Sequence, residues 1–206
     1  MIMRGGKMMK KLLLTGFEPF LKFRSNPTEA AVRELDGLEI GEYSVTGKVY
    51  PVVFDKIDEL ITRDIEMEQP DTVVCLGLAG GRHTIHIERI AINCIDGRTD
   101  NDGFNPDGEK IDEAGPDGIF STLPVKKLEA ALKETEIPSD ISNTAGTYLC
   151  NNVMYTALNH IQKNGLDIPA GFIHVPAHHE IGTELDIPSW SQEDITRAVR
   201  TIVENL

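Results

Sequence analysis

Cysteine is scarce in this 206-residue sequence, which contains only Cys75, Cys94 and Cys150. Three thiols cannot all pair with one another, and no two of them have CxxC spacing, so neither a disulfide scaffold nor a zinc site is expected. This cysteine usage is typical of a reducing compartment and predicts a cytoplasmic location. Cys75 lies between Val74 and Leu76 in an apolar run, which favours a place in the core.

Long apolar runs and an excess of basic residues are also missing. No apolar stretch approaches the length that spans a bilayer, so no membrane partner is expected. The formal net charge of −13 argues against a nucleic-acid partner, because nucleic-acid binders usually present a basic face. Residues 1–9 lack the apolar central region of a signal peptide, and we expect them to be a tag or an upstream start.

Motifs for nucleotides and metals are absent as well. The sequence has no P-loop motif and no GxGxxG that opens a helix, so Gly77-Leu-Ala-Gly-Gly-Arg82 resembles a phosphate cradle only superficially. His174 and His178 lack the spacing of HExxH on a helix, and neither a metal site nor a cofactor is expected. His178 and His179 follow a proline and are predicted to be exposed loop residues.

Alternating strand and helix patterns run through the rest of the sequence. Helical spacing predicts helices between short apolar runs that predict strands. The predicted strands include residues 10–15, 44–53, 72–76, 137–141 and 171–175. Asn26, Asp55, Thr122 and Ser191 are predicted to cap four of the helices. The pattern predicts a single α/β domain over residues 10–206, with a mostly parallel sheet and helices on both faces.

In such a sheet the ligand site lies beyond the carboxyl ends of the strands. The loops expected to meet there are 16–20, 77–81, 145–150 and 174–178. Residues 96–118 are rich in Gly, Asp, Asn and Pro and are predicted to form one long loop. A loop of that length in a compact domain is usually functional or mobile.

Cys150 has the most distinctive setting of the three cysteines. It follows a predicted strand and a turn at Gly146, and it precedes apolar residues at helical spacing, namely Val153, Met154, Ala157, Leu158 and Ile161. A thiol at the start of a helix feels the positive end of the dipole and unpaired N–H groups, which favour thiolate and can hold an oxyanion. Cys150 is therefore a candidate nucleophile, and the alternative is a small buried apolar residue.

His174 and Glu88 are the candidate partners of such a nucleophile. His174 lies at the end of a predicted strand and is either a general base or a hydrogen-bonded structural histidine. Glu88 is a carboxylate in an isoleucine-rich strand, and a buried carboxylate needs a partner. That partner is either the neighbouring Arg89 or a histidine that Glu88 orients. Phe17 and Phe20 lie in a loop at the expected site and either fill the core or line an apolar pocket.

Seven segments carry a resemblance to a known family. In chain order they are Thr15-Gly-Phe-Glu-Pro-Phe20, Asn26-Pro27, Gly77-Leu-Ala-Gly-Gly-Arg82, Ile87-Glu-Arg-Ile-Ala-Ile-Asn93, Ser121-Thr-Leu-Pro124, Ser142-Asn-Thr-Ala-Gly-Thr-Tyr-Leu-Cys-Asn151 and Gly171-Phe-Ile-His-Val-Pro176. Over roughly residues 10–176, the sequence resembles the pyroglutamyl-peptidase I (pyrrolidone-carboxylate peptidase) family of cysteine peptidases.

The resemblance implies removal of an N-terminal pyroglutamate from peptides through a thioester acyl-enzyme, without a cofactor. It implies that Cys150 is the nucleophile, that His174 is the general base and then the acid, and that Glu88 orients His174. It also implies a cytoplasmic homo-oligomer, commonly a tetramer, with a fold like that of purine nucleoside phosphorylases.

The same resemblance assigns the substrate contacts. It implies that Phe17 and Phe20 sandwich the lactam ring and that Arg98 lies near the oxyanion. Some family members have glutamine at Leu78, so one polar contact is expected to be missing or replaced. The loop after Arg98 also departs from the family, as do residues 177–181, which are expected to frame the side of the leaving group or a subunit contact.

Two other functions compete with the peptidase interpretation. A nucleoside phosphorylase-like enzyme would bind phosphate and would not need Cys150. A binding protein that has kept the fold without activity would have an unreactive Cys150.

Overall fold

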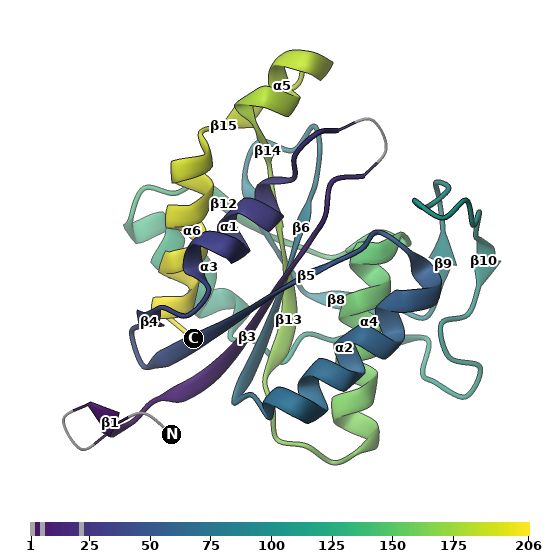
Figure 1. The fold of residues 1–206 in the computed structure, drawn as a ribbon, viewed down its shortest axis with the longest axis horizontal. Coiled ribbons are helices and arrows are strands. Elements are labelled where there is room, and N and C mark those ends of the chain that lie inside the picture. The colour runs from purple at the N-terminus through teal and green to yellow at the C-terminus, as the bar shows by residue number, and fades with distance from the viewer. Residues whose placement is uncertain (1–2, 5–6, 21–22) are drawn as a thin grey trace.

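A seven-stranded sheet forms the centre of the protein in a computed structural model that describes residues 3–4, 7–20 and 23–206. The strand order is β12-β7-β13-β6-β3-β5-β4 (Figure 1). The strands are β3 (Lys10–Phe17), β4 (Glu39–Ile40), β5 (Tyr43–Tyr50), β6 (Thr72–Leu78), β7 (Ile85–Glu88), β12 (Ser139–Ser142) and β13 (Ala170–Val175). Four neighbouring pairs are parallel, and only β13–β7 and β4–β5 are antiparallel. The predicted, mostly parallel sheet is confirmed.

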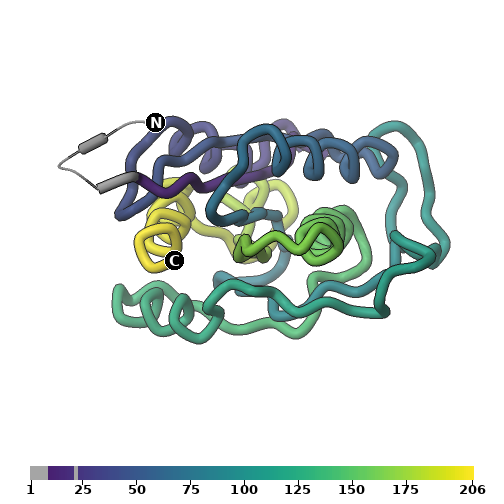
Figure 2. Tube along the Cα trace, turned by 90° about the horizontal axis from the view of Figure 1, so that it is seen from below, coloured from purple at the N-terminus to yellow at the C-terminus, as the bar shows by residue number. Residues whose placement is uncertain are grey.

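Helices cover both faces of this sheet, as the alternating pattern predicts. One layer contains α1 (Pro27–Leu35), α3 (Val125–Glu134) and α6 (Gln192–Glu204), and the other contains α2 (Phe54–Glu68) and α4 (Leu149–Lys163). Figures 1 and 2 show the two groups on opposite sides of the sheet. Each layer has its own apolar cluster, because side chains alternate between the two faces along a strand. Val74 and Leu76 of β6 join one cluster, whereas Val73 and Cys75 join the other.

Shorter elements lie around this core. They are β1 (Met3–Arg4), β2 (Lys7–Met8), β8 (Ile90–Ile92), β9 (Ile95–Asp96), β10 (Asp107–Glu109), β11 (Gly118–Phe120), β14 (Ala177–His178), α5 (His179–Leu185) and β15 (Ser189–Trp190). The predicted loop 96–118 contains β10, which pairs with β9. Of the predicted N-terminal extension, β1 pairs with β2, and residues 1–2 and 5–6 lie outside the described residues. No helix within the described part of the chain is long and apolar enough to cross a membrane.

Two of the four predicted helix caps are present. The Asn26 side chain accepts a hydrogen bond from the Thr28 N–H at the start of α1, and Ser191 caps α6 through the Asp194 N–H. The prediction of Asp55 as the cap of α2 is wrong, because α2 begins one residue earlier, at Phe54. The Phe54 N–H instead donates to the carboxylate of Asp100, at 2.9 Å, across 46 positions of sequence. The prediction of Thr122 as the cap of α3 is also wrong, because Pro124 stands at the N-cap position without a side-chain hydrogen bond, and the Thr122 hydroxyl donates to the Ala170 carbonyl instead.

The first strand of the central sheet is longer than predicted and ends at Phe17. Gly16 does not break it but lets α1 lie close to it, since a Cβ there would be 2.8 Å from the carbonyl oxygen of Thr28. The extension places Phe17 at the carboxyl end of β3, where its ring is buried against the α2 and α4 layer.

Candidate active site

Three neighbouring strands direct residues from their carboxyl ends toward α4. In β13, Phe172 packs in the α2 and α4 cluster and Ile173 in the opposite one, so alternation places His174 on the α4 side. In β7, Ile85 and Ile87 face away from α4, which places Glu88 toward it. The pairing of β13 with β6 sets His174 beside Gly77, and its pairing with β7 brings Glu88 opposite Phe172.

Glu88 and His174 form a buried pair. The Glu88 Oε1 atom lies 2.7 Å from Nδ1 of His174, and the two side chains are 0% and 7% exposed. When Nδ1–H donates to the carboxylate, Nε2 is the ring nitrogen that remains to accept a proton. Of the two alternatives open from the sequence, the structure contains the carboxylate–histidine contact.

The cationic partner of Glu88 is Arg82 rather than the neighbouring Arg89. Nη1 of Arg82 lies 3.1 Å from Glu88 Oε1, the same oxygen that contacts His174. The same nitrogen donates to Nδ1 of His86 at 2.6 Å. Burial, followed by the Arg82 charge, lowers the pKa of His86, which keeps that ring neutral and able to accept. Glu88 Oε2 has no hydrogen-bond partner among the described residues.

Cys150 is the second residue of α4, as predicted, with Tyr148 at the N-cap position. Its sulfur lies against Gly77, where an added Cβ would be 2.7 Å from Sγ. Because Gly77 is the register neighbour of His174, the sulfur and the imidazole share one corner of the site. In the part of the chain that the structure describes, no hydrogen bond joins Cys150 to His174.

The thiol of Cys150 is the resting form that this environment favours. Burial raises its pKa most, and the Glu88 charge raises it further, to about 12. The backbone N–H of Cys150 and the Arg82 charge act in the opposite direction but are weaker. The partial burial of Cys150 therefore has a larger effect on this pKa than the backbone N–H and the Arg82 charge, which favour the thiolate.

Two adjoining hollows lie at this end of the sheet, and one of them borders the sulfur. The smaller has a volume of about 50 Å³ and is lined by Cys150 together with Phe17, Phe20, Asn26, Val52, Leu78, Tyr148 and Leu149. The larger, which we call the outer cleft, has a volume of about 400 Å³ and does not reach Cys150. Phe20, Leu78 and Tyr148 line both, so they form the boundary between the two hollows.

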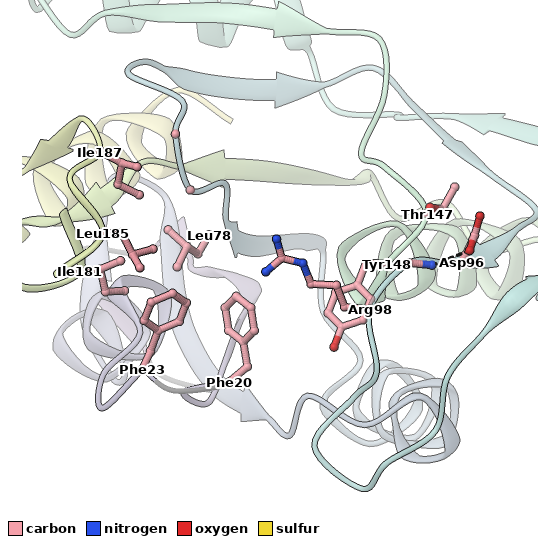
Figure 3. A pocket seen from close by; sticks show the side chains of 13 residues that line it. Phe20, Phe23, Leu78, Asp96, Arg98, Thr147, Tyr148, Ile181, Leu185 and Ile187 are labelled. Carbon is pink, nitrogen blue, oxygen red and sulfur yellow. Dashed lines mark hydrogen bonds between the residues drawn. The ribbon is translucent and has the colours of Figure 1, made fainter.

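The substrate-binding residues expected from the family resemblance fall into different hollows. Phe17 and Phe20 line the small cavity at Cys150. Arg98 lines the outer cleft, and Figure 3 shows its guanidinium extending across the cleft toward Leu78. No hydrogen bond or ion pair connects Arg98 to another residue of the described ranges. Leu78 faces both hollows and therefore makes an apolar surface where some family members have an amide.

The prediction that His178 and His179 are both exposed is wrong for His178. His178 is 9% exposed and is the N-cap residue of α5, where its ring accepts from the Ile181 N–H. Its Nε2 lies 2.9 Å from the hydroxyl of Ser25, which packs the ring against the loop before α1. His179 is exposed, as predicted, but it is the first residue of α5 rather than a loop residue. Within the described residues no group of three or more His, Cys, Asp and Glu side chains could hold a metal ion.

The sequence analysis did not predict three residues of the site, namely Arg82, His86 and Tyr148. Arg82 belongs to a glycine-rich loop, and only the tertiary structure shows that the Arg82 side chain contacts Glu88. Tyr148 lines both hollows and stands two residues before Cys150. Its closeness to Cys150 in the sequence is the one signal that could have identified it. No local pattern distinguishes His86, whose position follows from the antiparallel pairing of β7 with β13.

A cysteine at a helix start, close to a histidine that is hydrogen-bonded to a buried carboxylate, is the arrangement expected of an α/β cysteine hydrolase. Comparison with known proteins narrows this class. Residues 10–206 match the family described as pyroglutamyl peptidase, and the chain belongs to that family.

Relatives and solved structures agree with the match. The chain is 50% identical to the pyrrolidone-carboxylate peptidase of Oceanobacillus iheyensis over 195 residues, which cover 95% of this chain and 98% of the relative. It is 46% identical to that of Pyrococcus furiosus over 200 residues, covering 94% and 96%. Its fold matches the crystal structure of Bacillus amyloliquefaciens pyroglutamyl peptidase I with a TM-score of 0.92 at 38% identity, covering 95% and 96%. The pyrrolidone carboxyl peptidase of Thermococcus litoralis gives 0.91 at 40% identity, covering 95% and 92%.

Proposed function

We propose that the protein is a cysteine exopeptidase that removes N-terminal pyroglutamate from peptides. The observation that carries this proposal is the meeting of Cys150, the Glu88–His174 pair and a cavity bordered by Phe17 and Phe20 at one edge of the sheet. Membership of the pyroglutamyl peptidase family supports the same activity. Neither rival function from the sequence explains why a thiol and a carboxylate–histidine pair lie beside an apolar cavity.

His174 is the proposed general base. Its Nε2 takes the proton from Cys150 Sγ as the sulfur attacks the carbonyl carbon of pyroglutamate. A resting thiol fits this order, since its pKa of about 12 leaves little thiolate at neutral pH. The missing hydrogen bond between the two side chains does not oppose the proposal, because catalytic contacts often tighten only when substrate binds.

His174 then acts as the acid. It gives its proton to the nitrogen of the departing residue as the carbon–nitrogen bond breaks, and a thioester to Cys150 remains. Water adds to the thioester while His174 again accepts a proton, which releases pyroglutamate and restores the thiol. Glu88 holds the imidazole in the tautomer that makes Nε2 available and stabilises the imidazolium.

The oxyanion of each tetrahedral intermediate is proposed to accept from the backbone N–H of Cys150 at the start of α4. Arg98 is the proposed second donor, through the guanidinium that extends across the outer cleft. Loss of one such donor typically costs about 3 kcal/mol of transition-state stabilisation. The Arg98→Ala variant is therefore expected to retain slow turnover, whereas Cys150→Ala is expected to have none.

The small cavity is the proposed site of the lactam ring. Phe17 and Phe20 border it, and their faces suit a flat five-membered ring. Pyroglutamate has no free α-amine, so the cavity needs no carboxylate to receive one. The Phe20→Ala variant is expected to raise KM or lower kcat, and unchanged values of both would remove the ring-sandwich assignment.

We further propose that residues 10–206 form one peptidase domain, that residues 1–9 are an extension, and that the protein is a cytoplasmic homo-oligomer, a tetramer in particular. The resemblance of the sequence to its family supports these statements. Light scattering on a column-separated sample tests the assembly, and a monomer across the working concentration range would refute it.

Release of a fluorophore from a pyroglutamyl amide tests the activity. Wild type, Cys150→Ser and alkylated wild type are compared at equal folded concentration. The proposal expects activity in the first sample only. Absence of turnover in reduced, folded wild type would overturn the proposal, and protection of that protein against heat by phosphate would then favour the phosphorylase-like function.

A further inference from the structure

The outer cleft has an apolar wall that the proposed chemistry has not used. Ile181 and Leu185 of α5, together with Ile187 just after it, contribute side chains to one side of the cleft, where Phe23 joins them. Figure 3 shows these groups gathered opposite Arg98 and Tyr148. Leu185 is 48% exposed, although it lies in a hollow of about 400 Å³, a size that is typical of ligand sites.

This wall is held in place before any substrate arrives. The Ile187 N–H donates to the carbonyl of Gly182 at 3.1 Å. Gly182 itself has no room for a side chain, since a Cβ there would lie 2.3 Å from the Cβ of Ser189. At its start, α5 is joined to the loop before α1, where the hydroxyl of Ser25 donates to Glu180 at 2.7 Å. A wall fixed in this way gains affinity for a matching group without a large ordering cost.

The position of the wall relative to the sulfur defines which part of a bound peptide the wall would contact. The small cavity and the outer cleft meet along Phe20, Leu78 and Tyr148, and Cys150 borders only the small cavity. A peptide with its first residue in the small cavity has its scissile carbonyl beside Sγ. The chain then leaves through the boundary into the outer cleft, so the next side chain reaches the wall.

We propose that the outer cleft is the subsite for the residue that follows pyroglutamate, and that it selects substrates with a large aliphatic or aromatic side chain at that position. This inference rests on the proposed function. Leu78 belongs to the same apolar surface and continues it up to the cavity at Cys150. A glycine at that position of the substrate leaves the wall in water. An aspartate would lose hydration against the wall, and Arg98, on the opposite side of the cleft, is assigned to the oxyanion in the proposed mechanism.

The magnitude follows from the size of the side chain. Burial of each additional carbon group in an apolar pocket is worth roughly tenfold or more in kcat/KM when the contact is complete. Because the cleft is open to solvent at Leu185, the contact is incomplete. We therefore expect kcat/KM for the leucine substrate to be about tenfold higher than for the glycine substrate.

The experiment compares pyroglutamyl-leucinamide, pyroglutamyl-glycinamide and pyroglutamyl-aspartamide by the release of free amine. Uncharged C-terminal amides remove any contribution from a terminal carboxylate near Arg98. The enzymes are wild type, Leu185→Ser and Leu166→Ser. Leu166 is a matched control, since it is 40% exposed, lines a different hollow and has no part in the proposed site.

For wild type, the proposal expects the order leucine, glycine, aspartate in kcat/KM. Leu185→Ser is expected to lose several-fold on the leucine substrate and to keep its rate on the glycine substrate, while Leu166→Ser matches wild type on all three. Equal rates for the three substrates in wild type would overturn the subsite but leave the peptidase activity standing. A leucine preference that survives Leu185→Ser unchanged would also overturn it. Failure of wild type to cleave any of the three would refute the proposed function itself.

Discussion

Replacement of Gly77 by alanine tests the packing that brings the sulfur and the imidazole together. Gly77 lies in β6 between two groups that leave no space for a methyl group. An added Cβ would be 2.5 Å from Cζ of Phe172 and 2.7 Å from Sγ of Cys150. Neither neighbour is the free end of a flexible side chain, because Phe172 is 0% exposed and Cys150 is anchored in the first turn of α4.

The structural cost follows from these distances. Carbon atoms in contact lie about 3.5–4.0 Å apart, so the Phe172 ring has to move by about 1 Å. Overpacking of a dense core by one methyl group costs about 1–3 kcal/mol of unfolding free energy. For a chain of this size, each 1 kcal/mol corresponds to about 2–4 °C in Tm, which gives a loss of roughly 2–12 °C for Gly77→Ala.

The catalytic cost follows from what has to move. The Phe172 ring centroid lies 4.8 Å from that of His174, so a shifted Phe172 displaces the imidazole. If the ring stays, the Cys150 sulfur moves instead. A misplacement of about 1 Å at reacting groups costs about 100-fold in rate, and we expect a loss of that order in kcat/KM for Gly77→Ala.

Thermal unfolding and turnover of a pyroglutamyl amide measure the two effects. The Gly80→Ala variant is the stability control, because its Cβ would meet only Cδ1 of Ile187 at an ordinary 3.6 Å. Its unfolding free energy is expected to stay within about 0.5 kcal/mol of wild type. A Gly77→Ala protein with the Tm and kcat/KM of wild type would refute the packing argument.

Two further predictions concern charged groups. Arg82→Met leaves the buried Glu88 carboxylate without its cation, and we expect a loss of about 1–3 kcal/mol in urea unfolding together with a shifted pH–rate profile. The matched Arg89→Met variant should show neither effect, and equal losses in both variants would remove the special role of Arg82. The pKa of Asp112 is lowered from 3.8 to about 2, and the hydrogen bond from Lys163 is the largest cause. A carboxyl group whose pKa is lower in the folded state than in the unfolded state stabilises the fold at any pH above the unfolded-state pKa. The Tm of wild type should therefore exceed that of Asp112→Asn at neutral pH, and this difference should shrink as the pH falls from about 4 toward 2. A difference in Tm that is independent of pH would contradict this assignment.

Local sequence patterns were sufficient for most of the architecture. The caps at Asn26 and Ser191 follow from short-range hydrogen bonding within three residues, and the structure contains both. The helix start at Cys150 is equally local and was predicted correctly. The cap of α2 was not predictable in this way, because its acceptor, Asp100, comes from a distant loop.

The partners of Glu88 show where local reasoning ends. Arg89 is its neighbour in sequence, but it lies just after the end of β7, and the ion pair of Glu88 is with Arg82. Arg82 reaches the carboxylate only because the chain turns between β6 and β7. The burial of His178 has the same kind of cause, since its contact with Ser25 joins residues 153 positions apart.

The sequence alone determined the alternation of strands and helices, the mostly parallel sheet, the family resemblance and the placement of Cys150 at a helix start, because each depends on short-range periodicity or on motifs within a few residues. Tertiary structure alone decided that Glu88 pairs with Arg82 and His174, that Gly77 separates two close-packed groups, and that α5 forms one wall of a cleft. Burial also raises the pKa of the Cys150 thiol, and this effect is larger than the opposite effects of its backbone N–H and of the Arg82 charge. These properties arise from contacts between segments far apart in the chain, and no local pattern encodes them.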